Sequence, residues 1–88
     1  MEAKIKELEA LFEKASKLAE EIATEASDKA TVAKRTYRSL RHSGRDEEED
    51  AAMMEYDRYC MMKTQAEILE GNLRSFSITM DGLMNKCK

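Results

Sequence analysis

The chain contains no proline and only three glycines among its 88 residues, so the residues that most often interrupt helices are scarce. Aromatic residues make up 6% of the sequence, tryptophan is absent, and charged residues make up 38%. This composition disfavours sheet-rich and loop-rich folds and favours helices. The large apolar side chains suffice for a seam between helices but not for a thick globular core. We therefore expect one small all-α domain over residues 1–88.

Cysteine is also scarce, because Cys60 and Cys87 are too few for a disulfide framework. A reduced, cytoplasmic protein is the resulting expectation. No stretch approaches the roughly eighteen apolar residues of a spanning helix, and no apolar segment of a signal peptide follows Met1. The net charge of −3 is too small to indicate a nucleic-acid or membrane partner.

The residue patterns that carry chemistry are missing as well. His42 is the only histidine, and its place among arginines suits a cation at the end of a helix better than a ligand or a catalyst. The acidic run 46–50 lacks the alternating ligands and central glycine of a calcium loop. No Glu-x-x-His pair, glycine-rich phosphate loop or nucleophile–base signature is present. We predict a protein that is not an enzyme and uses no metal, cofactor or small-molecule substrate.

A heptad pattern predicts a first helix over about residues 2–42. Apolar residues alternate at spacings of three and four as far as Ala26 and then continue more sparsely. They are Ile5, Leu8, Phe12, Ala15, Ala19, Ile22, Ala26, Ala33 and Leu40. Lys29 and Thr36 interrupt the pattern, but Ala30 and Tyr37 lie one residue further on and can take over the contact.

The charge reverses across Gly44 near the middle of the chain. Residues 29–45 contain six bases and no acid, and residues 46–57 contain seven acids and no base. Folding the chain back at this glycine lays the two stretches side by side. We interpret the reversal as a device that sets the register of a hairpin, since exposed ion pairs contribute little stability.

The residues around Gly44 predict a tight turn over about residues 43–46. Ser43-Gly44 follows the last periodic residue, and glycine is the usual left-handed cap at a helix C-terminus. Asp46 can act as the N-cap of the next helix, with Glu49 completing a capping box. So short a connection makes the two helices antiparallel neighbours.

A second helix is predicted over about residues 47–86, since neither Gly71 nor Gly82 is accompanied by a second helix breaker. One set of core positions repeats every seven residues, and a second set is interleaved with it. The first set is Ala52, Tyr59, Ala66, Leu73, Met80 and Cys87, and the second is Tyr56, Met62, Leu69, Phe76 and Leu83.

Folding at Gly44 pairs residues whose numbers sum to about 88, and in most of the predicted layers a small residue faces a large one. The pairs are Ile5 with Leu83, Leu8 with Met80, Phe12 with Phe76, Ala15 with Leu73, Ala19 with Leu69, Ile22 with Ala66, Ala26 with Met62, Ala30 with Tyr59, and Ala33 with Tyr56. The agreement of size, charge and periodicity predicts an antiparallel, coiled-coil-like helical hairpin.

One seam is a thin basis for stability, so we expect the hairpin to be completed into a bundle by self-association or by a partner. Met54, Met61 and Ile68 recur every seven residues away from the predicted seam, with Met53 and Cys60 beside them. Leu11 and Leu18 extend the apolar area of the first helix. This surface either closes a homodimer into a four-helix bundle or binds a helix of another protein, for which adaptable methionines are suited.

Three features together resemble the small two-helix co-chaperones of type III secretion systems. They are the heptad first helix, the turn at Gly44–Asp46, and a second helix that contains Tyr56, Tyr59 and Ala66 and ends in apolar residues. The resemblance implies a protein that, with a repeat-containing partner, holds a needle subunit unassembled. Eukaryotic tethering and scaffold subunits share the same pattern.

The function that we predict is therefore protein–protein interaction, as a small chaperone, co-chaperone or assembly adaptor. A structural homo-oligomeric scaffold or tethering subunit is the alternative. A module that binds nucleic acid through the basic segment 34–45 is less favoured, because the adjacent acids repel the same phosphate backbone.

Overall fold

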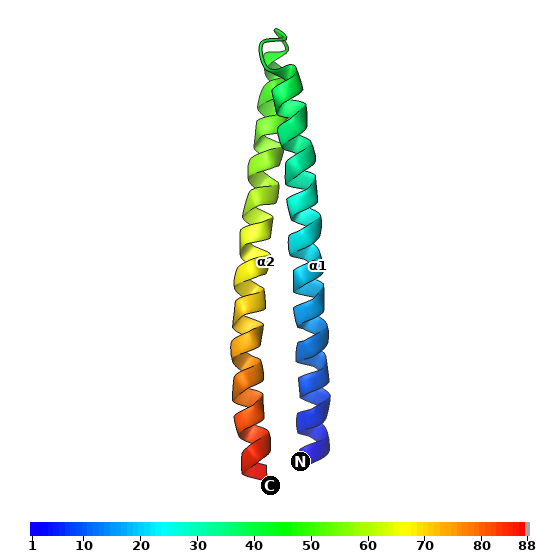
Figure 1. Cartoon of the computed structure of the whole chain (residues 1–88), viewed down its shortest axis with the longest axis vertical. Coiled ribbons are helices and arrows are strands. Elements are labelled where there is room, and N and C mark those ends of the chain that lie inside the picture. The colour runs from blue at the N-terminus through cyan, green and yellow to red at the C-terminus, as the bar shows by residue number, and fades with distance from the viewer. Residues whose placement is uncertain (88) are drawn as a thin grey trace.

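The computed structural model describes residues 1–87, with the side chain of Cys87 excepted, as two long helices folded back on each other (Figure 1). Helix α1 covers Glu2–Leu40 and helix α2 covers Asp46–Cys87. The helices run antiparallel, so both termini lie at one end and the turn lies at the other. The hairpin is a rod with extents of 68 × 14 × 14 Å. The predicted all-α helical hairpin is confirmed.

The helix ends carry charges that suit the helix dipole. Helix α1 has Glu2 in its first turn and Arg38 in its last turn. Helix α2 begins with five consecutive acids, four of them in its first turn, and has Lys86 in its last turn. Acids near a helix N-terminus and bases near a C-terminus stabilise the helix. Charge therefore supports both helices at both ends.

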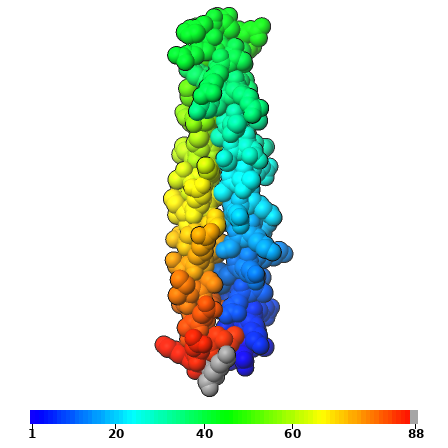
Figure 2. Space-filling model, in the orientation of Figure 1, coloured from blue at the N-terminus to red at the C-terminus, as the bar shows by residue number. Residues whose placement is uncertain are grey.

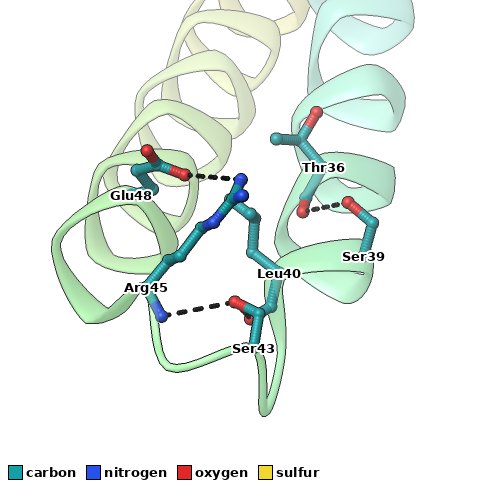
Figure 3. Close-up of polar contacts among 6 residues, drawn as sticks. All are labelled: Thr36, Ser39, Leu40, Ser43, Arg45 and Glu48. Carbon is teal, nitrogen blue, oxygen red and sulfur yellow. Dashed lines mark hydrogen bonds and ion pairs between the residues drawn. The ribbon is translucent and has the colours of Figure 1, made fainter.

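The turn differs in detail from the predicted one (Figure 3). Helix α1 ends two residues before the predicted position, and Arg41 is its C-cap, with φ −60° and ψ 127°. The next residue, His42, adopts the left-handed conformation with φ 65°. Gly44 is also left-handed, with φ 80°, but it lies two residues further on. His42 therefore occupies the position beside the helix end that we had assigned to glycine.

The second helix begins one residue earlier than predicted. Asp46 is its first helical residue, so the prediction that Asp46 is the N-cap is wrong. The backbone N–H of Glu49 donates to the carbonyl of Arg45 at 3.0 Å, which places Arg45 at the capping position. The Ser43 hydroxyl accepts from the Arg45 N–H at 3.3 Å and donates to the Leu40 carbonyl (Figure 3). Ser43 thus ties the end of α1 to the start of α2.

The seam between the helices is made mostly of alanine. Ten apolar residues are buried, and seven of them are alanines. They are Ile5, Ala19, Ala23, Ala26, Ala30, Ala33, Ala52, Ala66, Leu73 and Met80. The separation of two helix axes depends on the side chains at the contact, so a seam of methyl groups brings the backbones close together. The helices stay side by side along the whole rod (Figure 2).

Half of the predicted seam pattern is displaced by one residue. The positions that repeat every seven residues from Ile5 to Leu40 and from Ala52 to Met80 are buried or half-buried, as predicted, whereas Cys87 lies outside the described side chains. Most of the interleaved set is not: Ile22 is 47% exposed, whereas the neighbouring Ala23 is 8% exposed, although Ala15 and Tyr56 are half-buried. Six large side chains that we had placed in the seam are 41–52% exposed. They are Leu8, Ile22, Met62, Leu69, Phe76 and Leu83.

These six side chains are exposed because the alanine seam is too narrow to hold them. Residues three and four positions after a seam residue both lie near the contact line, on opposite sides of it. Ala23 and Ala30 fit between closely spaced helices, whereas Ile22 does not. On α2 the half-buried Lys63 and Glu70 border the seam, and their neighbours Met62 and Leu69 are displaced onto the side of the rod.

The predicted register is nevertheless confirmed by two contacts across the seam. The rings of Phe12 and Phe76 are stacked, with centroids 5.5 Å apart and planes at 23°. The Lys29 Nζ lies 5.7 Å from the centroid of the Tyr59 ring. Both pairs have residue numbers that sum to 88. The hairpin therefore folds back at the predicted position, but some of the side chains that face the other helix differ from the predicted ones.

Candidate interaction surface

One side of the rod carries a continuous line of large apolar side chains, which we call the apolar flank. Its residues are Leu8, Leu11, Leu18 and Ile22 on α1, and Met62, Leu69, Phe76 and Leu83 on α2. Each of them is between 41% and 59% exposed. On α1 the line passes through the half-buried Ala15 with the three–four spacing of a coiled-coil seam.

Both helices contribute to the same side of the rod. Phe76 belongs to the flank of α2 and stacks on Phe12 of the α1 seam. Lys29 occupies the corresponding position on α1 and lies over Tyr59 of the α2 seam. In each case a residue at a flank position of one helix contacts a seam residue of the other helix. Because the helices are antiparallel, these contacts place the flank positions of α1 and the flank positions of α2 on the same side of the rod.

The opposite side of the rod is polar. One shallow groove there is lined by Glu13 of α1 and by Arg74 and Asp81 of α2. Another is lined by Glu20, Lys63, Glu67 and Glu70 among others. The hairpin therefore presents one apolar and one charged flank. This difference gives the rod a preferred side for packing against other helices.

The partner-binding residues predicted from the sequence fall on two different surfaces. Leu11 and Leu18, 59% and 50% exposed, belong to the apolar flank. Met54, Met61 and Ile68 are 72%, 68% and 52% exposed and form what we call the methionine stripe. Met53 is 36% exposed and lies near the basic end of α1, where it shares a small hollow with Lys34, Tyr37, Arg38, Arg41 and Tyr56.

The methionine stripe points away from α1. Met61 lies two residues after Tyr59 and two residues before Lys63, both of which face the seam region. Two residues correspond to a rotation of about 200° on a helix, so Met61 projects from the back of α2. The same spacing holds for Met54 and Ile68. The stripe is therefore centred about 100° further around α2 than the apolar flank.

The charge reversal at the tip produces no direct ion pair between the helices. Between side chains in residues 1–87, the two ion pairs are Arg45 with Glu48 at 3.5 Å and Arg74 with Glu70. Neither pair joins α1 to α2. The basic and acidic stretches lie alongside each other, but their charges are left in solvent. They remain available to a further chain.

Two tyrosines mark the upper part of the seam. The ring of Tyr59 receives Lys29 from α1 and the guanidinium of Arg58, 5.2 Å from its centroid. Hydrogen bonding with the Cys60 side chain raises the pKa of Tyr56 above its ordinary value, and the charge of that thiol in its ionised form acts in the same direction. Both features are local and polar, and Tyr56 also lines the small hollow that contains Met53.

Within residues 1–87, no group of three or more His, Cys, Asp or Glu side chains converges well enough to hold a metal ion. Neither helix, within the part of the chain described, has a segment long and apolar enough to cross a membrane.

Comparison of the chain with protein-family models, with curated proteins and with solved structures finds no match. The resemblance to two-helix co-chaperones therefore rests on architecture alone.

The sequence contained a signal for the apolar flank that we misassigned. The heptad spacing of Leu69, Phe76 and Leu83 predicts one helix face, and that face is the apolar flank rather than the seam. The spacing of Leu8, Leu11, Ala15, Leu18 and Ile22 is itself a second heptad line, beside the first. Two heptad lines on one helix indicate two packing neighbours, and the hairpin supplies only one.

Proposed function

We propose that this protein is a non-enzymatic interaction module that works by packing its exposed apolar side chains against helices of another chain. The observation that carries the proposal is the apolar flank, where eight large apolar side chains are about half exposed on one side of the rod. Continuous apolar surface of this kind on a small protein marks an interaction site. Cys60 and Cys87, too few for a disulfide framework, support a cytoplasmic location as part of the same proposal.

Within this proposal, a chaperone or assembly adaptor would bind its partner subunit through the methionine stripe. Met54, Met61 and Ile68 provide one anchor for every seven residues, which matches a helix laid along the back of α2. Methionine suits such a site because its flexible thioether adapts to different partners. The alternative, a homo-oligomeric scaffold, is favoured by the heptad spacing of the apolar flank. The two readings use different surfaces and are compatible.

The experiment is affinity purification of the tagged full chain from its native cells, with three variants compared. Wild type should retain a protein partner in defined stoichiometry. Met61→Glu should lose that partner, since it places a charge in the middle of the methionine stripe. Leu69→Glu tests the apolar flank in the same way. Thr24→Glu, on the charged flank of α1, adds the same charge away from both surfaces and should retain the partner. Retention of every co-purifying protein by both Met61→Glu and Leu69→Glu would refute the proposed function.

A further inference from the structure

We propose that the apolar flank is covered by a second copy of this chain, with the two hairpin tips at the same end. In this dimer, α1 of each copy lies on α2 of the other, and the four helices form an antiparallel bundle. The inference rests on the proposed function and names the occupant of the flank. It also leaves the methionine stripe on the outside of the bundle.

The exposed area of the hairpin fits a dimer. A compact monomer of 10.1 kDa exposes roughly 5,300 Å², whereas this chain exposes 6945 Å². A standard interface buries about 800 Å² on each partner, which is about half of that excess. A single layer of two helices has only one seam, and stable domains bury their apolar faces between two layers.

The spacing of the flank fits a second helical seam rather than a scattered patch. On α1, Leu8, Leu11, Leu18 and Ile22 lie about a quarter turn around the helix from the alanine seam. This is the angle between the two neighbours of each helix in a four-helix bundle. On α2, the flank residues recur every seven positions from Met62 to Leu83. A second hairpin therefore meets both lines at once.

Charge selects the orientation of the second copy. Residues 1–28 contain eight acids and four bases, and residues 58–88 contain five bases and three acids. With the tips together, the acid-rich part of α1 lies on the base-rich part of α2 of the other copy. Near the tips, the basic stretch 29–45 lies on the acidic stretch 46–57. Between the side chains that the structure describes, neither ion pair joins α1 to α2, so these charges are not paired across one hairpin.

The reverse orientation also buries the apolar flanks, but it brings like charges into contact. With the tips at opposite ends, the flanks overlap only when the open ends of the two hairpins are brought together. Each α1 then lies on α1 of the other copy, and residues 1–28 face the same acid-rich segment. Like charges in contact disfavour this arrangement.

The first measurement is the mass of the full chain by sedimentation equilibrium. Wild type should give twice the 10.1 kDa chain mass. Leu69→Glu and Ile22→Glu should raise the dissociation constant at least 100-fold. Ile78→Glu is the matched control: Ile78 is 74% exposed, carries the same substitution and lies on the other side of α2, so this variant should remain a dimer. A monomeric wild type, or equal effects of all three substitutions, overturns the inference.

The second measurement determines the relative orientation of the two copies, and it leaves the residues of the apolar flank unsubstituted. A spin label is attached at Glu47→Cys near the tip, in a chain with Cys60→Ser and Cys87→Ser. Tips at the same end place the two labels within about 35 Å, because helices in one bundle are neighbours or diagonal. Tips at opposite ends place them roughly 80 Å apart, at about 1.5 Å per residue from the centre of the overlap. The short distance supports the proposed dimer, and the long distance overturns it.

Failure of this inference is distinguishable from failure of the proposed function. A monomeric wild type that still loses a partner on Leu69→Glu or Met61→Glu overturns only the second copy as occupant. Retention of all partners by both variants, together with a monomeric wild type, overturns both.

Discussion

Replacement of Ala19 by leucine tests the close packing of the alanine seam. Ala19 is the most buried of the core residues in the described part of the chain, at 1% exposure. Ala23 and Ala26 follow it along the same line and are also buried. A leucine at this position has to displace the facing helix or leave its preferred rotamer, because α2 closes the space above the methyl group. In an ordinary leucine-rich coiled coil, the same change would add apolar contact and stabilise the pair.

The expected cost follows from overpacking. Additional methylenes in a well-packed core cost about 1–3 kcal/mol. The helix propensities of leucine and alanine differ by only a few tenths of a kcal/mol, so the effect reports packing. For a domain of this size, about 2 kcal/mol corresponds to a fall in the melting temperature of about 8–16 °C. Ala19→Leu should therefore melt about 8–16 °C below wild type.

The assay is thermal and urea unfolding followed by far-ultraviolet circular dichroism at equal protein concentrations. Equal concentration matters because a dimer melts at a concentration-dependent temperature. Ala10→Leu is the control, since Ala10 lies on the exposed side of α1 and should change stability by less than about 0.5 kcal/mol. If Ala19→Leu melts at or above the wild-type temperature while Ala10→Leu is neutral, the seam accepts large side chains and the reasoning from close approach is wrong.

Two further predictions concern the tip and the upper seam. His42→Gly should stabilise the hairpin by about 0.5–1 kcal/mol, since a left-handed histidine costs about 1–2 kcal/mol, and the greater chain entropy of glycine in the unfolded state offsets part of the gain. Gly44→Ala should destabilise the hairpin by about 1 kcal/mol. Urea unfolding of both variants measures the two changes in stability, and changes of the opposite sign would contradict the turn geometry. Cys60→Ala should lower the pKa of Tyr56 toward its ordinary value, measured by ultraviolet titration of the phenolate, because hydrogen bonding with Cys60 holds it above that value. The raised pKa of Tyr56 stabilises the folded state at pH values below the ordinary phenol pKa, and this stability is lost as the pH rises through the raised value. If the titration of Tyr56 is unchanged in Cys60→Ala, hydrogen bonding with Cys60 is not the cause of the raised pKa.

The candidate surface was only partly predictable from the sequence. Leu11, Leu18 and the methionine stripe were recognised as apolar residues outside the seam, and all of them are exposed in the hairpin. Ile22 and Leu69 were assigned to the seam and instead belong to the apolar flank. Their assignment failed because a residue three positions after a seam alanine and a residue four positions after it are equally compatible with the periodicity.

The turn shows a similar division. Gly44 was correctly expected to be left-handed, because few other residues adopt that conformation easily. The left-handed conformation of His42 was not expected, since residues other than glycine adopt it only uncommonly. It arises because the chain must reverse within a few residues while Ser43 holds both helix ends. Closure of the hairpin, rather than local propensity, decides the conformation of His42.

The sequence by itself determined the helical class, the place of the turn and the register of the hairpin. These depend on local properties: the heptad period, the absence of proline and the breaker at Gly44, with the stacked Phe12 and Phe76 as the check. Only the tertiary structure decided which side of each helix enters the seam. Alanines at 19, 23, 26, 30 and 33 let the backbones approach closely, and at that distance the large side chains no longer fit between them. The apolar flank exists because packing two helices this closely excludes the residues that periodicity alone would have buried.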